Sequence, residues 1–155
     1  MVNPIIIVIL LSISPISELR GAIPTGIALG LDLWTVFLIA VIANILISAV
    51  IFLFLDFIHK RLITNSNYRK FFNRYVEHIR TRKNSVQKKI NLYGLPALAI
   101  FVAIPLPLTG AYTGTLIAWL LNLNRWKAFA AIDLGVVVAG LLVTFVTLGI
   151  VSLIF

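Results

Sequence analysis

The residues best suited to chemistry lie in the segment Ser14–Pro24, which reads SPISELRGAIP. Glu18 and Arg20 stand two positions apart there, inside an otherwise apolar run from Pro4 to Leu31. Ionisable residues at membrane depth are costly, and they usually face a protein interior or a wet cavity where they bind a ligand or carry protons. The segment therefore predicts a buried site for a charged group, with Arg20 as the residue that attracts an anion.

Prolines bracket this pair and predict a break in the helix. Pro15 and Pro24 remove backbone donors, and irregular backbone at membrane depth must be packed in protein or line a wet cavity. The helix that starts after the break turns its N–H groups and positive dipole end toward the same region, with Ser17 as the expected N-cap. A second break, Ile104–Gly114, reads IPLPLTGAYTG and offers Thr109 as the N-cap of the next helix.

If the two breaks face each other, they gather a cation, hydroxyl groups and two helix N-termini. Such a set suits an anion, most simply a phosphate. The predicted substrate-binding residues are Ser17, Glu18, Arg20, Gly21 and Pro24 in the first break and Thr109, Gly110, Tyr112, Thr113 and Gly114 in the second.

Glu18 and Asp133 are the predicted proton carriers. A carboxyl group in apolar surroundings can load and release a proton near neutral pH, because burial disfavours its charged form. The alternatives are structural: Glu18 and Arg20 neutralise each other, and Asp133 bonds to a polar neighbour such as Asn44.

No residue pattern indicates an enzyme. The carboxylates are scattered, a Gly-rich nucleotide loop is absent, and the chain has no cysteine. His59 and His78 lie in the polar middle of the chain, where we expect them to be solvated and not to bind a metal. We therefore predict no catalytic residue, no metal and no cofactor.

The composition indicates a membrane protein. The chain has 155 residues, 61% of them hydrophobic, with a mean hydropathy of +1.07, and a soluble domain cannot cover that much apolar surface. Leu33–Asp56 and Trp126–Phe155 are long enough to cross a hydrocarbon core of about 30 Å. The runs Pro4–Leu31 and Tyr93–Leu123 are instead broken into arms of about ten residues, each spanning about half a bilayer. We predict that these runs are re-entrant helical hairpins, although a kinked span stays open for the first.

Basic residues predict the orientation. Ten of the 13 Lys and Arg residues lie between Lys60 and Lys89, which places the connector 57–92 in the cytoplasm under the positive-inside rule. Apolar and aromatic residues recur there at three- and four-residue steps, which predicts an amphipathic helix on the inner leaflet. A solvated loop is the alternative, and nucleic-acid binding is not expected.

The two apolar halves resemble each other weakly. Leu31–Phe37, LDLWTVF, aligns with Leu123–Phe129, LNRWKAF, and the same shift of 92 residues places Pro15 on Pro107. The repeated Trp can also be read as an interfacial aromatic belt.

These features together predict the architecture. Residues 1–155 form a single membrane domain, in which 1–56 and 93–155 are two repeats. One hairpin and one span move the chain across the membrane once, so the second repeat is inserted upside down, as in many transporters. We expect an all-α polytopic protein of the cell membrane, built as an inverted repeat. So small a bundle can scarcely enclose a polar cavity alone, so we also expect a homodimer or a larger homo-oligomer.

Both breaks carry a family resemblance. ELRGAIP (Glu18–Pro24) and PLPLTGAYTG (Pro105–Gly114) resemble two signatures of the family named "putative small multidrug export proteins", which is in turn similar to the DedA superfamily. The resemblance implies two oppositely inserted re-entrant hairpins and proton-linked transport of lipid carriers such as undecaprenyl phosphate. It also implies that Glu18, Arg20 and Pro24 match the acidic, basic and proline positions of the first hairpin.

The second break departs from the DedA pattern. DedA proteins have arginines around this turn, whereas Leu106 and Leu108 flank Pro107 here. A phosphate clamp with two cations is therefore not predicted.

Three functions are compatible with these residues. The first is a DedA-like transporter or flippase for an amphipathic anionic lipid, coupled to protons. The second is a small multidrug exporter in which Glu18 binds a lipophilic cation. The third is a membrane scaffold whose connector recruits partners.

Overall fold

The computed structural model describes residues 3–58, 61, 64–67, 69–70, 72–74, 77, 94–106, 109–121 and 123–154. Regular structure in these residues is helical, with no strand, as predicted. The elements are α1 (Pro4–Ile13), α2 (Glu18–Ala28), α3 (Leu33–Leu53), the π-helix η1 (Phe54–Ile58), α6 (Leu95–Ala103), α7 (Ala111–Leu120) and α8 (Arg125–Ile154). Most of the predicted connector 57–92 lies outside the described residues, and so do Pro107 and Leu108.

Two helices are long and apolar enough to cross a membrane. They cover Leu33–Phe57 and Arg125–Ile150 and agree with the two predicted spans, apart from small shifts at their ends. The first begins where the Asp32 carboxylate accepts hydrogen bonds from the backbone N–H of Thr35, at 3.0 Å, and from its hydroxyl, at 3.2 Å. This N-cap satisfies a backbone donor that the first turn of a helix leaves free.

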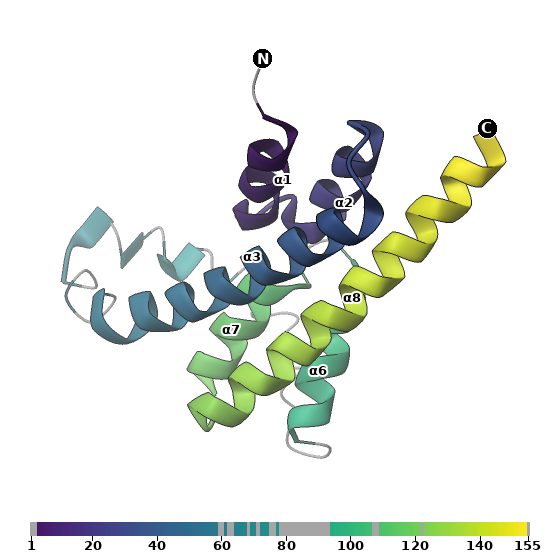
Figure 1. Ribbon diagram of the computed structural model, residues 1–155. Coiled ribbons are helices and arrows are strands. Elements are labelled where there is room, and N and C mark those ends of the chain that lie inside the picture. Colours follow the sequence, from purple (N-terminus) through teal and green to yellow (C-terminus); the bar gives the residue numbers. More distant parts are fainter. Residues whose placement is uncertain are drawn as a thin grey trace.

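The two long helices, α3 and α8, pack against each other and run antiparallel (Figure 1). In the first half of α3, Phe37 and Val41 lie against Gly140, which is midway along α8. Near the other end, Arg125 Nη2 at the start of α8 lies 2.8 Å from Asp56 Oδ2 in η1. The chain therefore passes in opposite directions along its two long apolar helices.

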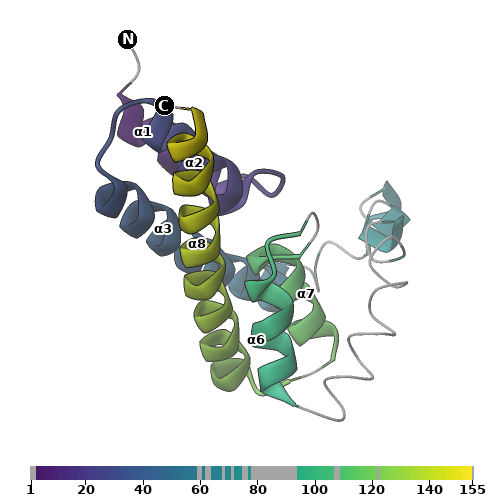
Figure 2. The same ribbon diagram turned by 90° about the vertical axis from the view of Figure 1, so that its right-hand side faces the viewer.

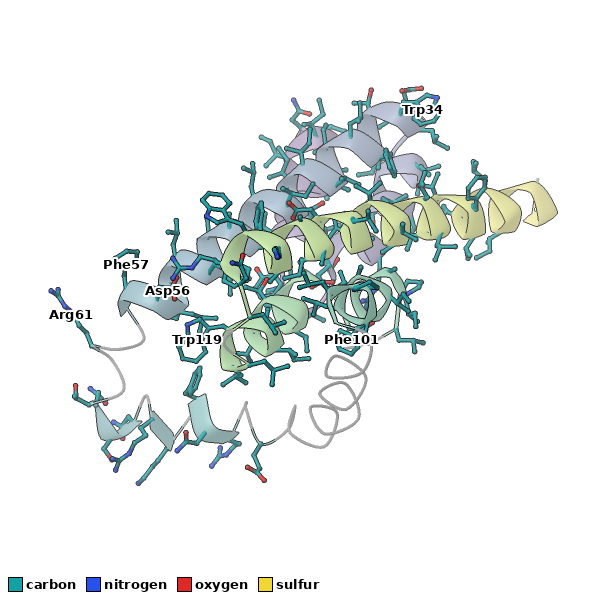
Figure 3. All side chains as sticks on the ribbon, turned by 90° about the horizontal axis from the view of Figure 1, so that it is seen from below. Trp34, Asp56, Phe57, Arg61, Phe101 and Trp119 are labelled. Atoms are coloured by element: carbon teal, nitrogen blue, oxygen red, sulfur yellow. The ribbon has the colours of Figure 1, made fainter. Side chains whose placement is uncertain are left out.

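α7 also contacts Asp56, the partner of Arg125. Trp119 Nε1 donates a hydrogen bond to Asp56 Oδ1 at 3.2 Å (Figure 3). Asp56 therefore joins the end of the α3–η1 segment to both α7 and α8.

Each broken apolar run folds into two short helices joined at the predicted break. α1 packs against α2, and both contact α3, while α6 and α7 contact each other and α8. The two pairs lie toward opposite ends of α8 (Figure 2). The pair α1–α2 therefore lies toward the C-terminal end of α8, and the pair α6–α7 lies toward its start.

Glycines set the close contacts between the short and long helices. A Cβ on Gly26 of α2 would lie 2.7 Å from Val36 Cγ1 of α3. A Cβ on Gly135 of α8 would lie 2.6 Å from the Ala99 carbonyl oxygen and 2.7 Å from Val102 Cβ, both in α6. Small residues at helix interfaces allow such approach, which van der Waals packing in a lipid environment requires.

The Gly135 contact can be tested with Gly135→Ala. The added methyl group meets backbone and a β-branched side chain, so we expect a loss of about 1–3 kcal/mol of stability, the usual cost of overpacking. Thermal unfolding in detergent would measure it.

Gly149→Ala on the same helix is the matched control, because its Cβ would meet nothing within 4 Å. An equal or smaller loss for Gly135→Ala than for Gly149→Ala would contradict the close packing of α6 on α8.

Candidate functional site

Arg20 joins the two breaks. Its Nη2 donates a hydrogen bond to the backbone carbonyl of Thr109 and lies 3.2 Å from the Thr109 hydroxyl oxygen. Arg20 lies in α2, and Thr109 lies just before α7, 89 positions later in the chain. The structure therefore brings together the two breaks that the sequence singles out.

Glu18 lies at the N-terminal end of α7. Its side chain is buried, with Oε2 3.8 Å from Arg20 Nη2 and Oε1 accepting a hydrogen bond from the backbone N–H of Tyr112 at 3.5 Å. A Cβ on Gly110 would overlap the Glu18 carboxylate. A helix N-terminus presents free N–H groups and a positive dipole end. The anion at this N-terminus is therefore a side chain of the protein itself.

The backbone of Glu18 adopts an unusual conformation. Its φ is +48°, and within the described residues it is the one positive φ outside glycine. This left-handed conformation costs a side-chain-bearing residue about 1–2 kcal/mol. Such strain is concentrated at functional positions, where the surrounding structure holds it in place.

Tyr112 makes a further connection between the helix pairs. Its hydroxyl donates a hydrogen bond to the carbonyl of Ile13, the last residue of α1. The last carbonyls of a helix have no partner within it, so this bond satisfies one of them. Tyr112 thus binds the first helix pair through both its backbone and its side chain.

The predicted N-cap role of Ser17 is wrong. Ser17 occupies the position before α2, but its side chain makes no cap hydrogen bond. Its backbone has φ −89° and ψ −49°, which is helical rather than the extended conformation usual at an N-cap. Its hydroxyl instead lies 3.4 Å from the carbonyl of Glu18.

The predicted N-cap role of Thr109 is wrong as well. Gly110 is the residue at the N-cap position of α7, and because glycine has no side chain it makes no side-chain cap hydrogen bond. The Thr109 hydroxyl lies 2.6 Å from the carbonyl of Ile104 and 2.7 Å from that of Leu106, so it bonds back to the residues that follow α6. It is drawn there because the end of α6 leaves carbonyl groups without helical partners.

The other predicted residues have mainly structural contacts. A Cβ on Gly21 would overlap the Ser17 hydroxyl, and one on Gly114 would lie 2.5 Å from Val102 Cγ2. Pro24 lies inside α2, where it provides no N–H for the carbonyl four residues earlier. Thr113 is buried in α7.

Asp133 is not part of this site. It lies on α8, and its Oδ1 is buried without a hydrogen-bond partner among the described residues. The alternative bond to Asn44 is not formed, because the Asn44 amide donates to the carbonyls of Ser12, at 3.0 Å, and Ala40, at 3.3 Å.

Asn44 is a site residue that sequence reasoning considered only as a partner of Asp133. It is fully buried in α3, and its Oδ1 has no hydrogen-bond partner among the described residues. It lines the same cavity as Glu18 and Arg20. The available signal was an amide in the middle of an apolar span.

The cavity at the site is small. Its volume is about 10 Å³, and it is lined by Glu18, Leu19, Arg20, Asn44, Val102, Gly110, Ala111, Val136 and Ala139. This volume is close to the minimum that holds one water molecule. In this conformation the site is therefore closed around its own charged groups, with the Arg20 side chain 21% exposed and that of Glu18 9%.

Two long apolar helices, and a Glu18–Arg20 ion pair placed where the two broken runs meet, indicate a helical membrane protein with a polar centre. A protein-family model described as "Putative small multi-drug export protein" matches residues 18–142, from Glu18 to well inside α8. The chain belongs to this family. Comparisons with curated proteins and with solved structures gave no match.

The contact of Glu18 with the start of α7 can be tested by a double-mutant cycle. Gly110→Ala places a methyl group on the Glu18 carboxylate, so we expect it to cost about 1–3 kcal/mol of stability. In a Glu18→Ala background the obstacle is gone, and the same substitution should cost less by about 0.5–3 kcal/mol.

Unfolding in detergent would provide all four stabilities of the cycle. An equal cost of Gly110→Ala in the two backgrounds would show that the carboxylate does not lie at this N-terminus.

Proposed function

We propose that this protein is a DedA-like exporter of an amphipathic anionic molecule, such as a lipid phosphate or a phospholipid, and that it exchanges protons at Glu18. One observation supports this most. An anionic group, the buried Glu18 carboxylate, lies at the N-terminus of α7 beside the partly buried Arg20. A substrate head group of the same charge would suit the same donors.

Competition for these donors supplies the coupling. When Glu18 is ionised, its carboxylate occupies the Tyr112 N–H and lies beside the Arg20 guanidinium. When Glu18 takes up a proton, its attraction for both groups falls, and they become available to a substrate anion. Proton uptake thus favours substrate binding, and proton release favours substrate release.

Transport requires this site to open. A cavity of about 10 Å³ has no room for a phosphate group. The hydrogen bonds from Arg20 to Thr109 and from Tyr112 to Ile13 join the two helix pairs, so access from either side requires at least one of them to separate. Movement of one repeat against another around a central site is a common transporter mechanism.

We propose the following arrangement in the membrane. The two helix pairs are re-entrant hairpins that enter from opposite sides, the halves form an inverted repeat, and the connector 57–92 lies in the cytoplasm. The antiparallel α3 and α8 and the positions of the pairs toward opposite ends of α8 support it. Asp133 is a second proton carrier in this proposal, supported by its buried Oδ1, which has no hydrogen-bond partner in the part of the chain that the structure describes. Two or more copies together enclose the pathway.

Export of lipophilic cations is the second candidate, and the family description favours it. Glu18 would then bind the cation. In the closed conformation the Glu18 carboxylate is shared between Arg20 and a helix N-terminus, both positive, so a cation must displace them. The donors at the site suit an anion better.

Transport assays in liposomes distinguish the two candidates. With an anionic lipid phosphate as substrate, we expect Arg20→Gln to lower transport about 10- to 100-fold, the effect of losing a hydrogen bond to a charged group. Glu18→Gln, which resembles the protonated acid, should keep substrate binding but remove its dependence on pH.

Tetraphenylphosphonium uptake measures cation export in the same liposomes. Loss of this uptake in Glu18→Gln, together with normal lipid transport in Arg20→Gln, would replace the anion proposal with the cation proposal. Lys70→Gln, an exposed charge outside the site, is the control for both substrates.

Single cysteines test the arrangement in the membrane, because the chain has none of its own. We expect cysteines at positions 3 and 32 to react with an impermeant maleimide from one side and cysteines at positions 66 and 124 from the other. Labelling of positions 3 and 32 from opposite sides would show that the first helix pair crosses the membrane and is not re-entrant.

A further inference from the structure

Two apolar grooves flank the start of α8. One lies between α3 and α8, has a volume of about 230 Å³ and is lined by Ala49, Phe52, Leu53, Asp56, Arg125, Trp126 and Phe129. The other lies between α6 and α8, has a volume of about 510 Å³ and is lined by Leu95, Pro96, Ala99, Ile100, Lys127, Ala130, Ala131 and Leu134. Among the residues that the structure describes, each groove has a single basic residue in its lining.

The two basic residues differ in their electrostatic surroundings. Arg125 forms an ion pair with Asp56, so the first groove has no net charge. Lys127 is exposed, and no carboxylate of the described residues forms an ion pair with it. The groove between α6 and α8 therefore carries an uncompensated positive charge.

The shape of this second groove suits a hydrocarbon chain. Ala99, Ala130 and Ala131 contribute short side chains to its lining, and the approach of α6 to Gly135 keeps the two helices close. Ile100 and Leu134 are each 61% exposed and add apolar surface along it. Its described lining residues are all apolar apart from Lys127.

We propose that the groove between α6 and α8 binds one anionic phospholipid, with an acyl chain against its alanines and the phosphate at Lys127. The lipid contacts both helices and so holds the second helix pair on α8. Charge selects the lipid: a neutral zwitterionic head group gains little from a lone lysine, whereas an anionic one is attracted to it. This site is separate from the Glu18–Arg20 cavity, and the proposal does not depend on the transported substrate.

Lipid retention would test the site directly. The full chain is reconstituted with equal amounts of phosphatidylglycerol and phosphatidylcholine of identical chains, extracted again in detergent, and its co-purifying lipids are counted by mass spectrometry. We expect enrichment of phosphatidylglycerol, an affinity about fivefold lower in Lys127→Gln, and recovery in Lys127→Arg. Ala130→Trp, which fills the groove, should lower retention of both lipids.

Controls separate a specific site from general attraction to the membrane surface. Lys70→Gln removes an exposed charge elsewhere, and Arg125→Gln removes a charge that Asp56 already neutralises. Both should retain more phosphatidylglycerol than Lys127→Gln. Equal losses in all three variants, or equal retention of the two lipids by the wild type, would overturn the proposal.

Inorganic phosphate tests the source of the ligand. Because the acyl chain of the lipid contributes to binding, millimolar phosphate should leave phosphatidylglycerol in place. Displacement of the lipid by phosphate alone would identify Lys127 as a site for a free anion and would overturn the lipid proposal.

Discussion

The structure depends on one constraint: backbone and charged groups in apolar surroundings must find their partners within the protein. Each proline-containing break frees such groups, and the two breaks satisfy each other. Arg20 binds the carbonyl of Thr109, the Tyr112 N–H binds Glu18, and the Tyr112 hydroxyl binds the end of α1. At the polar centre, each helix pair therefore supplies hydrogen-bond partners for polar groups that the break leaves free in the other pair.

The long helices make this encounter possible. α3 and α8 run antiparallel, and glycines at positions 26 and 135 let a short helix approach each of them closely. Membership of an export family fits a protein that places the Glu18–Arg20 pair where the broken helices meet. The same arrangement explains why the site is closed: Glu18, Arg20 and the Tyr112 N–H already have partners within the protein.

Sequence reasoning predicted what depends on local composition. Apolar length predicted the two helices that are long enough to cross a membrane, and Pro15 and Pro105 lie in the two breaks, whereas Pro24 lies inside α2. It failed at the caps, because the anion at the start of α7 comes from Glu18, 94 positions before Tyr112, whereas a local pattern suggests only the nearby Thr109. Asn44 was missed as a site residue because its place at the cavity depends on which face of α3 meets α2 and α7. Both failures concern contacts between distant segments.

Acidic residues from the first half of the chain hold α7 at both of its ends. Glu18 binds near its first turn, and Asp56 accepts a bond from Trp119 near its last. α7 has ten residues, is about 15 Å long and is attached at both ends. Sliding of α7 along its axis would therefore break both attachments at once. When Glu18 is neutralised and the Arg20–Thr109 and Tyr112–Ile13 bonds separate, the Asp56–Trp119 bond still attaches the last turn of α7 to the first half of the chain. Opening at the polar centre would then be a rotation of the N-terminal end of α7, and not a movement of the whole helix along its axis.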